Sequence, residues 1–500
     1  MAKDIMSFFP YSTPRQGQIE ILKAIEQYWD NFDVFVIVAP TAFGKSATLK
    51  AIASWAGNAS IITPTNLLVE QFAREFETDP DAGWAYGPPI HKLMKQEFYA
   101  CPRFGTGLGG KPIMNCQEAK AKYGKKLGCS SSCAYVSDNR RARGRGIGIY
   151  NYYTYMAHKL FRPVLLMDEA HNSIKTIQDL SSSRIWRHDY QYPWDMWNYG
   201  DIANWLEHYE ADGELPEQLQ ALKTEVTTTA PRYVIKRDRE LWAQSSIPEQ
   251  RPLLKMLPID IKDSMPFLWP TKVKKMVFLS ATISKIDIET LGLDRRRVLY
   301  LEAESPIPVE RRPIQRDYVS SLSRANMDTG TAAMAARIMD YYLPRYEGKK
   351  GFIHATYSQA KLLRTLLPNE DGRFMFHDKT NVRQVFDEFT ASPPELGRIM
   401  VASGLYEGVD LVDDLGRWQL LLKIPYPSLG DPAIKYKANQ SQSWYCWETL
   451  RQVMQAAGRI CRKEEDYGET FILDGSFEKL YKQGQTFELI PEWFSNAITN

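Results

Sequence analysis

Residues 33–46 read Asp33-Val-Phe-Val-Ile-Val-Ala-Pro-Thr-Ala-Phe-Gly-Lys-Ser46, and they indicate the fold class more strongly than any other segment. Its first half is a continuous apolar run, which is typical of a strand buried on both faces of a parallel sheet. Its second half is a loop that ends in Gly44, Lys45 and Ser46, and a helix is expected to begin near Lys45. A strand, a phosphate-binding loop and a helix in this order predict a nucleotide site at the end of the strand.

Each residue type in the loop suits the chemistry of a bound phosphate. Gly44 lets backbone N–H groups turn toward phosphate oxygens, and Lys45 supplies a positive charge at the β- and γ-phosphates. The Ser46 hydroxyl can ligate Mg²⁺. We therefore expect Thr41, Gly44, Lys45 and Ser46 to bind a nucleoside triphosphate together with Mg²⁺.

A second buried strand ends in two carboxylates. Pro163-Val-Leu-Leu-Met-Asp168 is followed by Glu169, Ala170 and His171. Isolated acidic pairs are usually solvated, but a pair that closes an apolar strand lies where parallel sheets bind ligands. Asp168 is predicted to hold Mg²⁺, and Glu169 to orient and deprotonate the attacking water.

The remaining apolar runs divide the chain into two α/β units. A chain of 500 residues is too long for one core. Further strands of the first unit are expected at 60–63 and 274–280, with a helix at 66–77 between them. A second series begins after residue 308, with strands expected at 351–354, 398–402, 420–423 and 470–474. The fold class is therefore α/β, with two parallel-sheet domains.

Bulk composition excludes several classes of protein. Apolar residues make up 44%, charged residues 24% and the net charge is +2, so the chain is an ordinary globular protein and not a polycation. The N-terminal residues contain too short an apolar run for a signal peptide, and no stretch approaches the roughly 20 apolar residues of a membrane span. We expect a cytoplasmic location without membrane contact, where thiols stay reduced.

Four of the six cysteines lie between the phosphate loop and the acidic box, in the pattern Cys101-x14-Cys116-x12-Cys129-x3-Cys133. Four thiolates suit either a [4Fe–4S] cluster or a structural zinc ion. Zinc ribbons prefer two closely spaced pairs, and only Cys129 and Cys133 form one, so the wide first spacings favour the cluster. A third interpretation is that the four thiols bind no metal. Cys446 and Cys461 are expected in the core.

The order of the motifs resembles that of the superfamily 2 DEAH-box DNA helicases of the XPD, Rad3 and DinG iron–sulfur family, over nearly the whole chain. The phosphate loop, the cysteines and Asp168-Glu-Ala-His171 carry this resemblance. Shorter elements of the family follow in the same order. They are Pro14–Gln18, Thr63-Pro-Thr65, Ser280-Ala-Thr282, Tyr406-Glu-Gly408-Val-Asp410 and Gln455-Ala-Ala-Gly-Arg459-Ile-Cys-Arg462.

The resemblance implies roles for these residues. Arg15 and Gln18 are expected near the adenine, with the choice between Gln16 and Gln18 open, and Gly408 and Asp410 are expected at the nucleotide. If Gln455, Arg459 and Arg462 continue one helix, their i, i+4 and i+7 spacing places them on one face. The expected arginine finger is Arg459, with Arg462 second. Thr65 is expected to contact DNA.

Ala42 departs from the family, because helicase loops usually carry glycine there. Alanine is costly if this position needs a positive φ.

Two further segments each allow a functional and a purely structural interpretation. Residues 117–146 hold eight basic and two acidic side chains, so Arg140, Arg141, Arg143 and Arg145 are expected to bind DNA phosphates, with a solvated face as the alternative. Residues 186–209 are rich in tryptophan and tyrosine. These aromatics can stack on bases, but a small core of their own is the favoured reading.

Together these features predict an ATP- and Mg²⁺-dependent DNA helicase, and the resemblance implies 5′ to 3′ translocation, RecA-like motor domains and single-stranded or forked DNA as partner. We expect a monomer. The alternatives are a DNA-stimulated ATPase that remodels protein–DNA complexes without unwinding, with zinc in place of the cluster, and a binding module with a decayed motor. The expected domains are motor 1 at 1–94, 147–171 and 266–304, a cysteine segment at 95–146, an arch-like insertion at 172–265 and motor 2 at 305–500.

Overall fold

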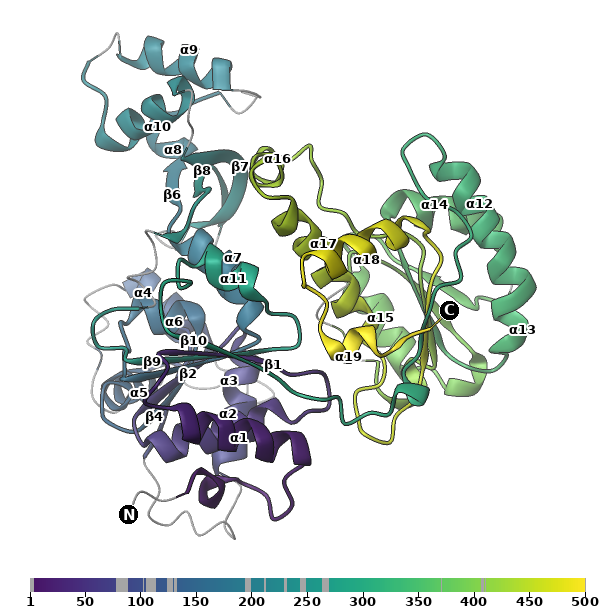
Figure 1. Cartoon of the computed structure of the whole chain (residues 1–500). Coiled ribbons are helices and arrows are strands. Elements are labelled where there is room, and N and C mark those ends of the chain that lie inside the picture. Colours follow the sequence, from purple (N-terminus) through teal and green to yellow (C-terminus); the bar gives the residue numbers. More distant parts are fainter. Residues whose placement is uncertain are drawn as a thin grey trace.

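The computed structural model describes residues 4–77, 89–101, 103–104, 114–123, 129, 133–193, 199–210, 213–228, 232–242, 249–262, 269–369, 371–405, 409 and 411–499. Two α/β domains lie side by side, and a separate lobe stands on the first of them (Figure 1). Each α/β domain is built around a seven-stranded parallel sheet, which confirms the predicted fold class.

The first sheet has the order β10-β1-β9-β5-β2-β4-β3. Its strands are β1 Val34–Val38, β2 Ala59–Thr63, β3 Ile90–Leu93, β4 Ile147–Asn151, β5 Val164–Asp168, β9 Lys275–Ser280 and β10 Val298–Glu302. β1 lies between β9 and β10, with Val38 opposite Ser280. Asp168, in β5, lies opposite Leu279. The phosphate loop, the acidic box and Ser280 therefore leave the sheet at one edge, where parallel strands place their ligands.

Helices cover this sheet. They are α1 Gln16–Tyr28, α2 Lys45–Ala56, α3 Asn66–Glu77, α6 Tyr152–Ala157, α7 Ser173–Leu180 and α11 Lys285–Thr290. α2 begins at Lys45 and α3 at Asn66, as predicted.

The second sheet has the order β13-β14-β12-β15-β16-β11-β17. Its strands are β11 Ile314–Gln315, β12 Gly351–Ala355, β13 Phe374–Phe376, β14 Ile399–Ser403, β15 Trp418–Leu421, β16 Glu469–Ile472 and β17 Ile498–Thr499. Its main helices are α12 Met327–Arg337, α14 Tyr357–Leu366, α15 Val382–Ala391, α16 Pro432–Gln440, α17 Gln442–Ala457, α18 Ser476–Thr486 and α19 Glu492–Ser495. The four predicted strands of this unit are present, although β15 begins earlier than expected because Trp418 is itself buried in the sheet.

The cysteine segment packs beside the first sheet through α4 Cys116–Tyr123 and α5 Ala134–Ala142. The end of α5 is held by Arg162, which is only 5% exposed. Its guanidinium donates to the carbonyls of Ala142 and Gly144, at 2.7 and 3.0 Å, and to the Tyr150 hydroxyl at 2.9 Å. This buried arginine ties the segment to β4.

The lobe that stands on the first domain is the insertion after the acidic box. It contains β6 Ser183–Trp186, α8 Arg187–Tyr190, α9 Tyr199–Glu210, α10 Glu217–Thr227, β7 Tyr233–Trp242 and β8 Glu249–Pro258. The strands form an antiparallel sheet in the order β6-β8-β7. Tyr192 is fully buried, and Tyr190, Trp205 and Tyr209 pack against the same cluster. These aromatics thus form the small core of the lobe, as the favoured interpretation of the sequence predicts. Trp194 and Trp197 lie outside the described residues.

Candidate functional site

The phosphate loop has a left-handed backbone at Gly44, which glycine adopts without strain. Its φ is +85°, and a Cβ atom there would lie 2.4 Å from Nε2 of Gln18. The Gln18 amide donates to the Gly44 carbonyl at 3.2 Å, and its oxygen accepts from the backbone N–H of Arg15 at 3.0 Å. Gln16 instead donates to Glu20. Of the two glutamines, the structure thus brings Gln18 to the loop.

Ala42 has a φ of +64°, so the position does require the left-handed region. A non-glycine residue there costs roughly 1–2 kcal/mol. The side chain of Ala42 packs against a cluster of the second domain that includes Ile460 and Cys461. Arg15 adds a second link, because it donates to the Ala42 carbonyl and pairs with Glu464 of the second domain at 3.2 Å. The loop therefore touches both domains.

The two carboxylates of the acidic box have different environments. Asp168 ends β5 and is 5% exposed. Burial, with the neighbouring charge of Glu169, raises the pKa of Asp168 to about 7. Glu169 pairs with Lys45, with Nζ 2.7 Å from Oε1. Although burial opposes it, the charge and the hydrogen bond of Lys45 lower the pKa of Glu169, so this carboxylate is ionised at neutral pH.

His171 connects the acidic box to the end of β9. Its Nδ1 lies 2.8 Å from Oγ of Ser280, and the same Oγ accepts from the backbone N–H of Thr282 at 3.1 Å. Burial lowers the pKa of His171 to about 4, so the ring is neutral at physiological pH. A neutral imidazole can donate at one nitrogen and accept at the other. Asn172 lies 3.0 Å from Nε2, so both ring nitrogens have partners.

The C-terminal end of α17, in the second domain, faces this edge of the first sheet. The prediction that one helix carries Gln455, Arg459 and Arg462 is wrong. α17 ends at Ala457, so Arg459 and Arg462 do not continue the helix. Ile460 instead forms a bridge with Leu411, and Cys461 has a φ of +58°. Pairing with a neighbouring strand segment has replaced the helical turn.

Both arginines nevertheless lie near the acidic box. Arg459 donates to the carbonyls of Gln455 and Val409, at 3.1 and 3.0 Å. Arg462 donates to the carbonyl of Gly458 at 3.2 Å, and its charge contributes to lowering the pKa of Glu169. Gln455 is 6% exposed, and within the described part of the chain its amide nitrogen and oxygen have no hydrogen-bond partner.

A buried polar contact that the sequence did not signal joins the two domains. Asp287 of α11 is 2% exposed and accepts from the Trp447 indole at 2.9 Å and from Arg451 at 2.8 Å. Burial raises the pKa of Asp287 to about 6. Trp447 and Arg451 are four residues apart on α17 and therefore share a face. That spacing is the only hint that the sequence offered.

Two other predicted positions have different outcomes. The Thr65 hydroxyl accepts from the backbone N–H of Leu68 at 3.3 Å, which caps α3. Gly408 and Asp410 lie outside the described residues.

The four cysteines come near one another. Cys101, Cys116 and Cys133 are buried and Cys129 is exposed. Burial, and then the charges of the three other thiols, raise the pKa of Cys116 to about 11. Among the residues that the structure describes, however, no three or more His, Cys, Asp or Glu side chains are arranged to hold a metal ion. Cys446 and Cys461 are buried, as expected.

The basic residues of this segment gather at the end of α5. Arg140, Arg141, Arg143 and Arg145 are all exposed. Arg141 pairs with Asp138 at 2.5 Å.

In the described part of the chain, no helix is long and apolar enough to cross a membrane.

Comparison with known proteins agrees with this arrangement. The helicase C-terminal domain family matches residues 353–497. The regulator of telomere elongation helicase 1 homolog of Caenorhabditis elegans is 24% identical over 313 residues, covering 53% of this chain and 31% of that protein. The regulator of telomere elongation helicase 1 of Bos taurus is 29% identical over 145 residues, covering 25% and 11%. The chain thus spans about a third of the length of the first relative.

Solved structures match almost the whole chain. An XPD helicase superposes with a TM-score of 0.61 at 14% identity, covering 96% of this chain and 98% of the other. Xpd4 of S. tokodaii superposes with a TM-score of 0.57 at 12% identity, covering 97% and 99%. These matches show that the two parallel-sheet domains are RecA-like. The domain family and the relatives are those of helicases, and the solved structures show that the chain has the fold of XPD-type helicases.

Proposed function

We propose that this protein is an ATP- and Mg²⁺-dependent DNA helicase that moves 5′ to 3′ along a single strand and unwinds duplexes in replication, recombination or repair. One observation carries the proposal. The Lys45–Glu169 ion pair lies at a sheet edge that the charge of Arg462, from the other domain, also reaches. A cleft with a cation and a base on one wall and arginines on the other suits phosphoryl transfer to water.

Each side chain of the cleft has a role in this reaction. Lys45 binds the β- and γ-phosphates, and its release from Glu169 frees that carboxylate to accept a proton from the attacking water. Arg459, with Arg462 beside it, stabilises charge on the γ-phosphate oxygens. Ser46 and Asp168 would hold Mg²⁺, which supplies positive charge at the phosphates when bound. Gln455, whose buried amide lacks a protein partner, is suited to the same phosphate or to the water.

The link from His171 to Ser280 supports coupling between ATP and the DNA strand. Ser280 and Thr282 follow the acidic box at the same sheet edge, and a change at Glu169 reaches them through one imidazole. Movement of either group alters a short chain of hydrogen bonds in a buried setting, where such bonds are strong.

Cys101, Cys116, Cys129 and Cys133 would hold the [4Fe–4S] cluster, with zinc as the alternative. The mutual influence of these thiols on the Cys116 pKa supports this donor set. A bound cluster supplies a rigid cross-link. The segment that it would stiffen carries Arg140, Arg141, Arg143 and Arg145, which are exposed and suited to DNA phosphates.

A strand-displacement assay on duplexes with a 5′ tail or a 3′ tail tests the proposal. ATP should drive displacement only from the 5′-tailed duplex, and Glu169→Gln should abolish it. Displacement from the 3′-tailed duplex alone would reverse the polarity. DNA-stimulated ATP turnover without displacement would instead indicate a translocase that remodels protein–DNA complexes.

A further inference from the structure

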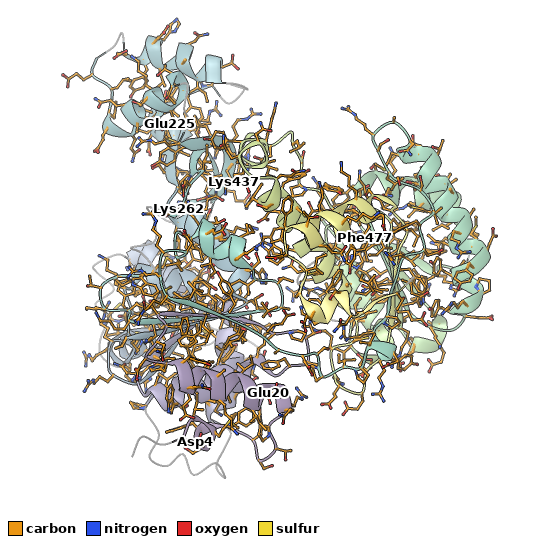
Figure 2. The ribbon with its side chains drawn as sticks, in the orientation of Figure 1. Asp4, Glu20, Glu225, Lys262, Lys437 and Phe477 are labelled. Carbon is orange, nitrogen blue, oxygen red and sulfur yellow. The ribbon has the colours of Figure 1, made fainter. Side chains whose placement is uncertain are left out.

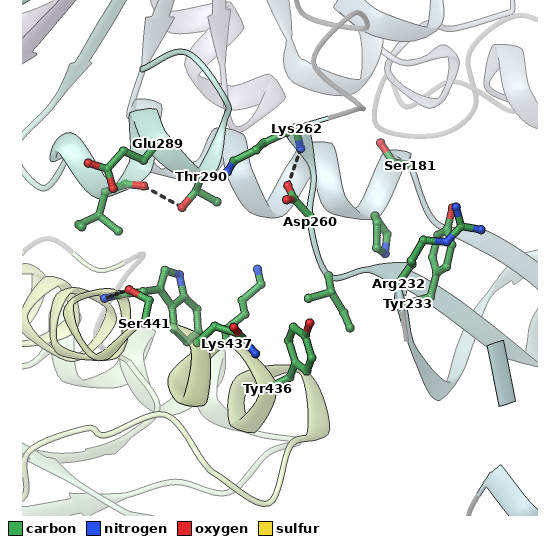
Figure 3. A pocket seen from close by; sticks show the side chains of 15 residues that line it. Ser181, Arg232, Tyr233, Asp260, Lys262, Glu289, Thr290, Tyr436, Lys437 and Ser441 are labelled. Carbon is green, nitrogen blue, oxygen red and sulfur yellow. Dashed lines mark hydrogen bonds between the residues drawn. The ribbon is translucent and has the colours of Figure 1, made fainter. Parts of the chain in front are cut away.

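The two ends of α17 meet the first domain in different ways. At the N-terminal end, the Ser441 hydroxyl caps the helix by accepting from the backbone N–H of Trp444 at 3.1 Å. Both residues line a cavity of about 580 Å³ whose opposite wall includes Glu289 of α11 (Figure 3). At the C-terminal end, a Cβ atom on Gly458 would lie 3.7 Å from Cγ2 of Thr41 in the phosphate loop. The C-terminal end of α17 therefore packs against the phosphate loop.

Apolar packing holds the body of α17 in the second domain. Leu450 and Val453 are fully buried in a cluster that also contains Phe477 of α18 (Figure 2). Apolar contacts are not directional, so they do not by themselves fix the orientation of the helix end. The last carbonyl groups of a helix have no partner in its own backbone ladder and need donors from elsewhere. The carbonyl of Ala457, the last residue of α17, accepts from Nε2 of Gln419 in the sheet at 3.2 Å.

Gln419 is a buried amide in the middle of the second sheet. β15 lies between β12 and β16, and the Gln419 side chain is fully buried. Its Nε2 also donates to the hydroxyl of Thr470, the paired residue of β16, at 2.8 Å. Its Oε1 lies 3.2 Å from Nε2 of His354 on β12. Burial of an amide is costly unless its groups are bonded, and here both the nitrogen and the oxygen have partners.

His354 connects this amide to the charge of Arg459. His354 is 1% exposed, and burial lowers its pKa to about 4, against the effect of the hydrogen bond with Gln419. The ring is therefore neutral at physiological pH, and a neutral ring donates from one nitrogen. The charge of Arg459 lowers the same pKa, as burial does, so Gln419 and Arg459 share a neighbour.

The turn that carries Arg459 lies on the same face of the sheet as the buried amide. Phe352 and His354 are two residues apart on β12 and share a face, with their ring centres 4.9 Å apart. Ile460 packs in one cluster with Phe352. These contacts are apolar, whereas the hydrogen bond to Ala457 has a defined direction and length. Arg459 follows Ala457 by two positions, so movement of that carbonyl moves the backbone that carries the guanidinium.

We propose that Gln419 is a positioning residue for Arg459. Held by His354 and Thr470, its amide fixes the carbonyl of Ala457 and thereby the place from which Arg459 reaches the γ-phosphate. Gln419 is fully buried beneath the helix end, so it acts through Arg459 and does not itself contact the nucleotide. This inference rests on the proposed function, because it takes Arg459 as the group that stabilises the transition state. A misplacement of about 1 Å at a reacting site can cost about 10²-fold in rate.

Gln419→Met tests the proposal, because methionine has a similar length but cannot donate a hydrogen bond. ATP turnover is measured without DNA. The kcat should fall at least about tenfold, whereas the KM for ATP should stay within about twofold, since the phosphate loop belongs to the other domain. Arg459→Ala and the double variant are compared by single-turnover hydrolysis with enzyme in excess. The double variant should be no slower than Arg459→Ala alone, because nothing remains to be positioned.

Gln359→Met is the matched control. Gln359 is 1% exposed in the same domain, and its amide bonds Thr331 of α12 and Thr356 at the start of α14, not α17. This variant should lower the melting temperature, as Gln419→Met does, and leave kcat unchanged. Thr470→Val removes one partner of Gln419 and should lower kcat by a smaller amount than Gln419→Met. If Gln419→Met does not fold, an unchanged kcat in Thr470→Val overturns the inference.

The outcomes separate this inference from the proposed function. An unchanged kcat in Gln419→Met, or an equal loss of kcat in Gln359→Met, would show that Gln419 has only a structural role. A double variant that is slower than Arg459→Ala would show that Gln419 acts apart from Arg459. Each of these results overturns the inference alone. Near-normal turnover in Arg459→Ala would overturn the role of Arg459 in the proposed function, and the inference with it.

Discussion

The nucleotide cleft is assembled from residues far apart in the sequence and the cysteine segment from one continuous stretch, and the two are held in different ways. In the cleft, the charged side chain of Lys45 already pairs with Glu169, and His171 already bonds Ser280, although the Gln455 amide has no partner among the described residues. In the cysteine segment, burial and then the charges of the three other thiols raise the pKa of Cys116, so these side chains do not stabilise one another as thiolates.

This difference has a physical cause. Opposite charges and hydrogen-bonding groups satisfy each other, so the cleft is shaped before ATP arrives. Thiolates repel one another and need a metal to hold them together. The cleft should therefore lose chemistry but keep its fold when one residue is changed, whereas the cysteine segment should lose its ligand and its order together.

The largest expected effect is on ATP turnover in the cleft. Lys45→Ala and Glu169→Gln should each abolish turnover, the first by removing charge at the phosphates and the second by removing the base. Nucleotide binding should survive in Glu169→Gln, because the side chain stays polar and Lys45 is released. Turnover assays and nucleotide titrations measure both. Near-normal turnover in Glu169→Gln would contradict the assignment of the water-activating residue.

Arg459→Ala should follow, with turnover lowered by about 10³–10⁵-fold, as is usual for an arginine finger. Circular dichroism should show both domains folded. Arg462→Ala is the comparison, because its charge also reaches Glu169. A twofold loss at Arg459 with a large loss at Arg462 would transfer the role to Arg462.

The cysteine segment should respond as one unit. Purified protein should be brown and contain iron and acid-labile sulfide in matching amounts, and serine at any one of Cys101, Cys116, Cys129 or Cys133 should bleach it. Cys446→Ser, in a buried position of the second domain, should not. Limited proteolysis of the bleached variants should cut between residues 95 and 146. Colourless protein with stoichiometric zinc would establish the zinc alternative.

Ala42→Gly tests the backbone strain in the phosphate loop, because glycine adopts a positive φ without strain. Relief of about 1 kcal/mol should raise the melting temperature by a few degrees. Ala47→Gly makes the same chemical change inside α2, where glycine is unfavourable, and should lower the melting temperature instead. A lower melting temperature in Ala42→Gly would show that the contact of the Ala42 methyl group with the second domain outweighs the strain.

The smallest effect concerns pH and the contact between the domains. The pKa of Asp287 is raised to about 6 in the folded protein, so the folded state binds more protons than the unfolded state between pH 4 and 6. Its contribution to stability is fully present below pH 4 and is lost as pH rises through 6. Asp287→Asn should remove this part of the pH dependence of the unfolding temperature. An identical pH profile in the variant would place the titration elsewhere.

Much of the fold follows from the sequence because its signals are local. Apolar runs such as 34–39 and 163–167 specify buried strands, and the polar residues that end them must gather at one edge of a parallel sheet. Gly44, Lys45, Asp168 and Glu169 could therefore be predicted as one site. The short edge strands β11, β13 and β17 could not, since two or three residues carry no readable period.

Other features depend on contacts between distant parts of the chain, which no local sequence pattern encodes. The helix that was expected to carry Arg459 and Arg462 ends at Ala457, because pairing of Ile460 with Leu411 overrides the helical spacing. Lys236 and Asp431 lie 195 positions apart and read as ordinary solvated charges until the insertion meets α16. Periodicity reports how a segment buries its own faces, whereas a contact between domains depends on where two separately folded surfaces meet, and that is set by the packing of the whole chain.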